Sequence, residues 1–186
     1  MNRRRFFQTL RLLLTPSSAK RTTYLKKKNV FRHLGNNCSI MDRIVPLYAN
    51  LISIGDNVHL ASNIKFITHD ASHIMMNNLY GDLYNESIGC IEIGNNVFVG
   101  SNTTILMNVK IGNNVIVGAN SVITKDIPDN SVVAGVPARI IGGFDAFAEK
   151  RKKHLYPLEM KPIIGKRITK ELEEYMWKKF YNDRTN

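Results

Sequence analysis

Residues 91–128 read IEIGNNVFVGSNTTILMNVKIGNNVIVGANSVITKDIP, and this stretch decides the fold. A large apolar residue returns at every sixth position. These residues are Ile93, Val99, Ile105, Ile111, Val117 and Ile123, and small or β-branched residues stand four places after the first five, at Val97, Thr103, Val109, Val115 and Ser121. A period of six fits neither a helix nor a series of hairpins. It is typical of a parallel β-helix, in which each hexad is one short strand and one corner.

The repeat has a direct physical meaning. The large apolar residue of each hexad is expected to point into a triangular prism, with the smaller residue packed beside it. Gly94, Gly100, Gly112 and Gly118 follow inward residues, and we expect Gly or Asn there to supply the positive φ that a corner needs. One coil cannot bury its own core, so neighbouring coils must stack on it.

The same pattern extends toward the N-terminus and is interrupted once. Inward residues are predicted at Leu34, Ile40, Ile54, Leu60 and Phe66. From Phe66 to Ile93 is 27 residues, where an unbroken repeat needs six. Residues from about 67 to 92 must therefore leave the prism as a loop, and His69 stands where they leave. Loops that interrupt a rigid scaffold often carry function.

Charge is unevenly distributed along the chain, whose predicted domains are a basic N-terminal arm at residues 1–30, a β-helix at 31–143 and a helical segment at 144–186. Residues 1–41 hold ten Lys and Arg and no acid, residues 42–143 hold five against eight acids, and residues 144–186 hold eleven against seven. The basic character therefore belongs to the ends. This argues against a nucleic-acid partner and favours tails that meet an anionic surface.

The two ends have separate predictions. Residues 3–14 are expected to form a helix that either rests on an anionic membrane or packs on its own or a neighbouring subunit. Its predicted apolar face is Phe6, Phe7, Leu10, Leu13 and Leu14, opposite Arg4, Gln8 and Arg11. Residues 17–30 are predicted to be a polar basic linker. Two amphipathic helices, at 145–153 and 168–181, are expected to cap the open end of the prism.

The remaining sequence signals concern the compartment. Cys38 and Cys90 are the only cysteines, lack metal-ligand spacing and are expected to be buried free thiols. No run is long and apolar enough for a transmembrane helix, and the N-terminal segment lacks a signal-peptide cleavage site. The expected location is therefore the cytoplasm, with peripheral contact at the inner membrane face through residues 3–14.

The hexads, together with NSVVAGVPARII at residues 130–141, resemble the left-handed β-helix acyltransferases. The likeness is greatest to the galactoside, maltose and xenobiotic O-acetyltransferases and their relatives in polysaccharide gene clusters, over about residues 30–143. The resemblance implies an all-β solenoid of left-handed sense and a homotrimer with sites between subunits. It also implies acetyl-CoA as acyl donor, a carbohydrate acceptor and no metal.

The resemblance assigns catalysis to His69, as the base that removes a proton from the acceptor hydroxyl. A backbone carbonyl or a carboxylate is expected to hold its second ring nitrogen. Asp70 either orients a neighbouring His or is a turn residue, and His73 is the rival base. Acceptor-binding residues are predicted at Asp42, Met75 and Tyr80.

The coenzyme residues follow from the register of the repeats. In the resemblance, Ser101 offers its backbone N–H to the thioester oxygen, and Ala119 and Thr124 line the groove. Lys125 and Arg139 provide cations near the coenzyme phosphates. Relatives carry a further basic residue where this chain has Gly142, which predicts weaker phosphate binding or replacement by C-terminal Lys and Arg.

Three alternatives remain open at this stage. The first is N-acetylation of an amino sugar by the same machinery. The second is a zinc hydratase on the same solenoid, which needs three His ligands, and His59, His69 and His73 are available. The third is a trimeric scaffold without catalysis.

Overall fold

The computed structural model describes residues 3–81, 83–152, 156–160 and 167–184. The chain divides into two compact units, Met1–Phe147 and Ala148–Asn186, and each is described by itself. The first unit contains every strand found in the described residues, and the second holds most of the C-terminal helical segment.

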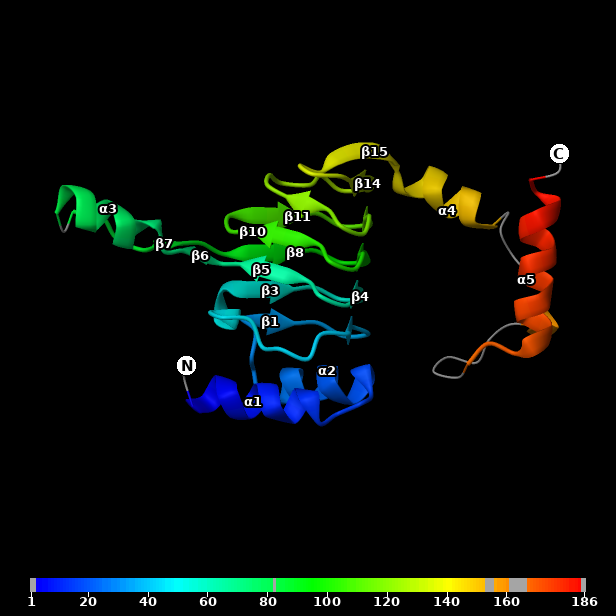
Figure 1. Cartoon of the computed structure of the whole chain (residues 1–186), viewed down its shortest axis with the longest axis horizontal. Coiled ribbons are helices and arrows are strands. Elements are labelled where there is room, and N and C mark those ends of the chain that lie inside the picture. Colours follow the sequence, from blue (N-terminus) through cyan, green and yellow to red (C-terminus); the bar gives the residue numbers. More distant parts are fainter. Residues whose placement is uncertain (1–2, 82, 153–155, 161–166, 185–186) are drawn as a thin grey trace. The chain divides into compact units, whose positions relative to one another are not determined.

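Three parallel sheets form the body of the first unit (Figure 1). One sheet consists of β1 (His33–Leu34), β3 (Ile52–Ile54), β8 (Ile91–Ile93) and β11 (Val109–Ile111). The second consists of β2 (Ser39–Ile40), β4 (Val58–Leu60), β9 (Val97–Val99), β12 (Val115–Val117) and β14 (Ser131–Ala134), with β15 (Arg139–Gly143) antiparallel at its edge. The third, here called sheet C, consists of β5 (Lys65–Ile67), β10 (Thr104–Leu106) and β13 (Val122–Ile123).

The predicted repeat is confirmed in its register and burial. Ile91 pairs with Val109 and Val97 with Val115, so each turn of the chain returns to the same sheet three hexads later. All eleven residues predicted to point inward between Ile93 and Ile123 are at most 3 % exposed. The hydroxyls of Thr103 and Ser121, buried among them, donate to the carbonyls of Gly100 and Gly118, each at 2.7 Å. Satisfied hydroxyls are what a buried position requires.

The prediction for the corners was partly wrong. Positive φ belongs to the Asn three places after the inward residue, with values of 56° at Asn96 and 53° at Asn114. The glycines that follow inward residues do not adopt it. Gly94 is needed for another reason, because a Cβ there would lie 2.8 Å from the carbonyl oxygen of Gly112 in the next coil. Glycine therefore sets how closely the coils stack, and Asn makes the turn.

The corner asparagines also form a ladder along one edge of the prism. The side-chain amide of Asn57 donates to Asn96, that of Asn96 to Asn114, and that of Asn114 to Asn130, at 2.8–2.9 Å. Each rung links two successive coils. The same residue type thus serves the turn within a coil and the bond between coils.

The N-terminal arm differs from its prediction. It forms two helices, α1 (Arg3–Leu13) and α2 (Ser18–Lys27), so a linker over residues 17–30 was wrong. The Ser17 side chain accepts a hydrogen bond from the Lys20 N–H and caps α2. Leu25 of α2 and Leu12 of α1 join the core that also contains Ile40. Tertiary burial therefore overrides the polar composition of this segment.

A buried arginine fastens the two helices to the prism. Arg21 is 2 % exposed, and its guanidinium donates to the carbonyls of Thr15 and Pro16 between the helices and to that of Met41 after β2. These three hydrogen bonds offset part of the free-energy cost of burying the charged guanidinium.

The C-terminal segment contains α4 (Phe144–Lys152), η2 (Leu158–Met160) and α5 (Lys170–Asn182). Both predicted helices are present, although Lys153, the predicted end of the first, lies outside the described residues. That they cap the prism stays a prediction.

Two further expectations concern the thiols and the membrane. Cys38 is half-buried, but Cys90 is exposed, so the expectation of two buried thiols was wrong for Cys90. Within the described ranges, no helix has the length and hydropathy to cross a membrane.

Candidate active site

The predicted excursion leaves the prism at the end of β5 (Figure 1). It begins as a two-stranded antiparallel ribbon of β6 (His69–Asp70) and β7 (Ser87–Ile88), which carries helix α3 (Ser72–Tyr80). The loop prediction is confirmed in position but not in form, since it contained no ribbon and no helix. Thr68 anchors the exit: it is fully buried, and its hydroxyl donates to the Leu47 carbonyl at 3.0 Å.

His69 is the first residue of the ribbon and is half-buried. The Tyr48 ring meets its imidazole edge-on, with the centroids 5.1 Å apart. The Tyr48 hydroxyl reaches the Glu86 carboxylate at 3.4 and 3.5 Å. Tyr48 lies between β2 and β3, immediately before η1 (Ala49–Leu51), with φ of 52°. The sequence did not predict Tyr48 as a neighbour of His69, nor Glu86 as a partner of Tyr48, because the hexad pattern is lost around Tyr48.

The prediction for the second ring nitrogen of His69 was wrong within the single chain. Its Nδ1 is buried and has no hydrogen-bond partner among the described residues. The Nδ1 of His73, in the first turn of α3, is also buried and has no hydrogen-bond partner among the described residues. Buried polar nitrogens without a partner are rare in folded proteins and mark a place that a ligand or another chain can complete.

Asp70 lies beside both imidazoles but is engaged elsewhere. Its Oδ1 accepts a hydrogen bond from the Ser72 N–H at 2.6 Å at the start of α3. Hydrogen bonds from Ser72 hold the pKa of this carboxyl below its ordinary value, and the nearby His73 and His69 add to the shift. The contacts thus favour the turn-residue alternative for Asp70.

The predicted acceptor residues are not all brought together. Met75 and Tyr80 lie on α3 and are 60 % and 62 % exposed. Asp42 instead braces a corner of the prism, where its two carboxylate oxygens accept the N–H groups of Asn63 and Ile64 at 2.6 and 2.9 Å. Burial raises the pKa of Asp42, and these hydrogen bonds oppose the shift. Its predicted contact with the acceptor must therefore compete with a structural role.

Four of the five predicted coenzyme residues lie along the two edges of sheet C, and the fifth, Arg139, begins β15 of the neighbouring sheet. Ser101 and Ala119 follow β9 and β12, which are paired, so they occupy the same corner in successive coils. Thr124 and Lys125 follow β13, at the opposite edge. Thr124, Lys125 and Arg139 line one surface hollow of about 450 Å³. The structure thus gathers three of the five predicted coenzyme residues around one hollow.

His69 and this hollow share an edge of the prism. β5, β10 and β13 are successive strands of sheet C, and His69 leaves beyond the end of β5 while Thr124 follows β13. Two strand spacings separate these levels, which corresponds to roughly 10 Å along the prism. A flexible arm held at the hollow would reach the imidazole by following that edge.

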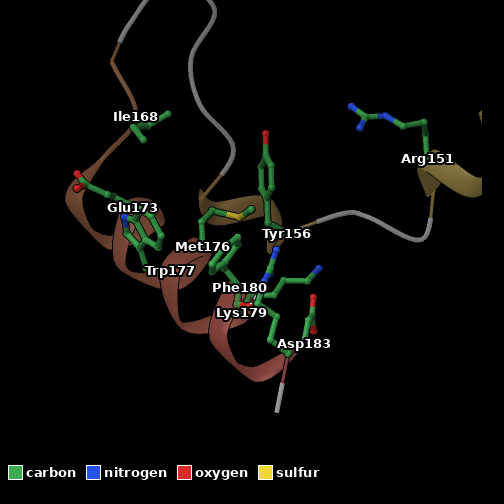
Figure 2. Close-up of a pocket in the computed structure, with 10 residues that line it drawn as sticks. Arg151, Tyr156, Ile168, Glu173, Met176, Trp177, Lys179, Phe180 and Asp183 are labelled. Atoms are coloured by element: carbon green, nitrogen blue, oxygen red, sulfur yellow. Dashed lines mark hydrogen bonds between the residues drawn. The ribbon is translucent and has the colours of Figure 1, made fainter. Parts of the chain in front are cut away.

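The described part of the chain offers two further observations. No three His, Cys, Asp or Glu side chains within it converge on a point that could hold a metal ion. In the C-terminal unit, Met176, Trp177, Phe180 and Tyr156 surround a hollow of about 680 Å³ (Figure 2). It contains none of the predicted site residues, and the Arg184 guanidinium lies 3.4 Å above the Phe180 ring there.

Comparison with known proteins shows the same repeat and the same fold. Residues 90–125 match the family model "Bacterial transferase hexapeptide (six repeats)". Protein CapG of Staphylococcus aureus is 38 % identical over 156 residues, covering 82 % of this chain and 86 % of that protein. Galactoside O-acetyltransferase of Escherichia coli is 38 % identical over 126 residues, covering 67 % of this chain and 58 % of that protein.

Solved structures agree with this assignment. A galactoside acetyltransferase in complex with coenzyme A is 28 % identical, with a TM-score of 0.57 and 86 % of each chain covered. A maltose O-acetyltransferase from Clostridium difficile 630 is 27 % identical, with a TM-score of 0.53 over 74 % of this chain and 82 % of that one. These likenesses and the repeat support the left-handed sense expected for the β-helix. The chain therefore belongs to the hexapeptide-repeat acyltransferase family, and it is an enzyme of that family.

Proposed function

We propose that this enzyme is an acetyl-CoA-dependent O-acetyltransferase whose acceptor is a sugar hydroxyl, in a bacterial surface polysaccharide or its lipid-linked precursor. The observation that carries the proposal is the shared edge of sheet C, with the His69 imidazole at one level and the hollow of Thr124, Lys125 and Arg139 two strands away. The relatives named galactoside and maltose O-acetyltransferase support the hydroxyl as acceptor.

In this proposal His69 acts as the general base. Its Nε2 takes the proton of the acceptor hydroxyl as the hydroxyl oxygen attacks the thioester carbonyl, and the imidazolium later gives that proton to the departing thiolate. An imidazole suits both steps because its ordinary pKa lies near neutrality. The edge-on Tyr48 ring fixes the imidazole plane.

The developing oxyanion needs a donor in place before the reaction. We assign this role to the backbone N–H of Ser101 of the partner subunit, because within one chain Ser101 and His69 lie at opposite ends of the sheet C strands. The Ser101 N–H makes no hydrogen bond within the described residues of its own chain. Lys125 and Arg139, both exposed at the hollow, provide positive charge for the phosphates of the donor. No covalent enzyme intermediate is required, since the thioester is already activated.

We further infer that the working enzyme is a homotrimer located in the cytoplasm, where acetyl-CoA is made. The excursion exposes Ile74, Leu79 and Leu83 by 58 %, 65 % and 79 %, and α3 buries no residue within its own chain. A neighbouring subunit would cover these side chains and could complete the Nδ1 atoms of His69 and His73. Around a threefold axis, such a head-to-tail contact closes into a ring.

An acceptor panel tests the proposed reaction. Purified enzyme is given acetyl-CoA with simple galactosides and with amino sugars that offer a free amino group, and thiol release is followed. A Cys90→Ser variant removes the exposed thiol as a source of background. Turnover with hydroxyl acceptors supports the proposal. Turnover confined to amino acceptors would establish N-acetylation instead, and binding without turnover on any acceptor would favour a scaffold.

A further inference from the structure

The first helix packs on the prism with the face opposite to its apolar one. In α1 the buried side chains are Gln8 and Leu12. Phe6, Phe7, Leu10, Leu13 and Leu14, here called the apolar platform, are 42–71 % exposed. At 100° per residue, the platform residues cluster on the helix side opposite Leu12. An amphipathic helix of a globular protein normally buries its apolar face, so this arrangement is the reverse of the usual one.

The helix is held firmly in that orientation. Leu12 is 1 % exposed and is part of the core. The Arg5 Nε donates to the Val45 carbonyl at 2.8 Å, and the Val45 N–H donates to the Thr9 hydroxyl at 3.3 Å. The Arg43 guanidinium donates to the Leu13 carbonyl at 3.2 Å near the end of the helix. The packed face cannot be exchanged for the apolar one without breaking these contacts.

The surroundings of the platform are basic and apolar. Arg3 and Arg11 are exposed on the same helix, and residues 1–41 contain no acid. The segment fastened to α1 adds exposed apolar side chains at Met41 and Ile44, which are 44 % and 63 % exposed. Figure 1 shows α1 and α2 at the end of the sheets beyond β1, while the excursion leaves from the level of β5.

We propose that the apolar platform of α1 docks on a membrane surface that contains anionic phospholipid. Apolar side chains enter the boundary between headgroups and acyl chains, and arginines remain at the headgroup level with the phosphates. Pairing two platforms face to face would bring Arg3 and Arg11 of both copies together without an acid to offset them. Charge complementarity therefore favours an anionic bilayer over a second copy of the chain.

Docking in this way goes beyond the proposed acetyl transfer and does not depend on it. Docking would orient the enzyme for that reaction. The end of the prism that carries α1 would face the lipid, so the enzyme would bind a lipid-linked acceptor close to the membrane surface.

Co-sedimentation of the full chain with vesicles tests the proposal. The vesicles contain phosphatidylcholine alone or phosphatidylcholine mixed with phosphatidylglycerol. We expect sedimentation only with the mixed vesicles and weaker sedimentation as salt is raised. Phe7→Ser with Leu14→Ser should abolish it, because both side chains point away from the prism and their loss leaves the packed face of α1 intact. Arg3→Gln with Arg11→Gln should weaken it by roughly thirtyfold at low salt, at about 1 kcal/mol per arginine.

A matched control removes exposed apolar surface elsewhere. Ile168→Ser with Met176→Ser, at 55 % and 45 % exposure in the C-terminal unit, should sediment like the wild type. The proposal is overturned if the wild type does not bind mixed vesicles, or if Phe7→Ser with Leu14→Ser binds as well as the wild type. It is also overturned if that variant instead lowers the mass measured by light scattering, since a second copy then covers the platform. Acetyl-CoA binding, measured separately, distinguishes failure of docking from failure of the proposed transferase.

Discussion

The hollow lined by Lys125 and Arg139 allows the donor site to be tested without knowledge of the acceptor. The perturbations are Lys125→Gln and Arg139→Gln, singly and together. Both side chains are exposed, so the dielectric is close to that of water. A cation about 5 Å from a phosphate of charge near −2 then gains about 1.7 kcal/mol before screening, and physiological salt reduces this to about 0.9 kcal/mol.

This magnitude predicts a change that calorimetry can resolve. Loss of one cation should raise the Kd for acetyl-CoA about fivefold, since about 1.4 kcal/mol corresponds to tenfold. The double variant should lose about as much binding free energy for acetyl-CoA as the two single variants combined. The sum should not be exact, because both cations act on the same anion. Raising the salt concentration should shrink every difference.

Lys110→Gln provides the control. Lys110 lies on β11, pairs with Glu92 at 3.0 Å and does not line the hollow, so its removal changes net charge equally without changing the site. An unchanged Kd for Lys125→Gln and Arg139→Gln in folded protein would refute the assignment of the hollow to the donor phosphates. If Lys110→Gln weakens acetyl-CoA binding as much as Lys125→Gln and Arg139→Gln do, the effect is due to net charge alone.

Three further predictions concern the ladder, the imidazole and the excursion. Asn114→Gly should lower the free energy of unfolding by about 1–2 kcal/mol, because two hydrogen bonds of the asparagine ladder are lost. Asn114→Ala should lower it by about 1 kcal/mol more, because alanine does not favour the φ of 53° at this position. Urea unfolding at one protein concentration measures both changes, and equal stability of the two variants would contradict the role of φ. Tyr48→Phe should keep kcat within about twofold, because the hydrogen bond from Tyr48 to Glu86 is long. Tyr48→Leu should lower kcat about two- to tenfold, because the His69 ring loses its edge-on contact. Equal kcat values for the two variants would argue against a positioning role of the Tyr48 ring. Because the pKa of Asp70 is lowered, its ionised form stabilises the start of α3 above the ordinary carboxyl pKa. Amide hydrogens of α3 should therefore exchange more slowly in the wild type than in Asp70→Asn, and this difference should disappear as pH falls through the lowered pKa. A difference that persists in acid would contradict this interpretation.

The prism could be predicted because its signal is periodic. Ile93, Val99 and Ile105 repeat at six residues, and only a coil that returns to the same sheet buries all of them. The same regularity fixed the register of Thr124 and Lys125, so their place at one edge of sheet C followed from counting.

The arm and the corners could not be predicted in the same way. Leu25 and Arg21 give no periodic signal within a basic segment, and their burial follows from tertiary contacts with the end of the prism. At the corners, composition alone does not separate a glycine needed for positive φ from one needed for close approach. Gly94 is of the second kind, which only the neighbouring coil reveals.

The site was predicted where it depends on the repeat and missed where it depends on the interruption. His69 stood out because the register breaks beside it. Tyr48 and Glu86 lie in irregular segments 38 residues apart, and neither their hydrogen bond nor the contact of Tyr48 with His69 has a sequence signature.

The central claim is that His69 performs chemistry on a donor that other residues bind. The most direct measurement is acetyl-CoA binding by calorimetry on the wild type and His69→Ala, with thiol release to a sugar acceptor followed in the same preparations. The account predicts the same Kd for both proteins and release by the wild type alone. Absence of binding in either folded protein, or release by His69→Ala at the wild-type rate, would contradict it.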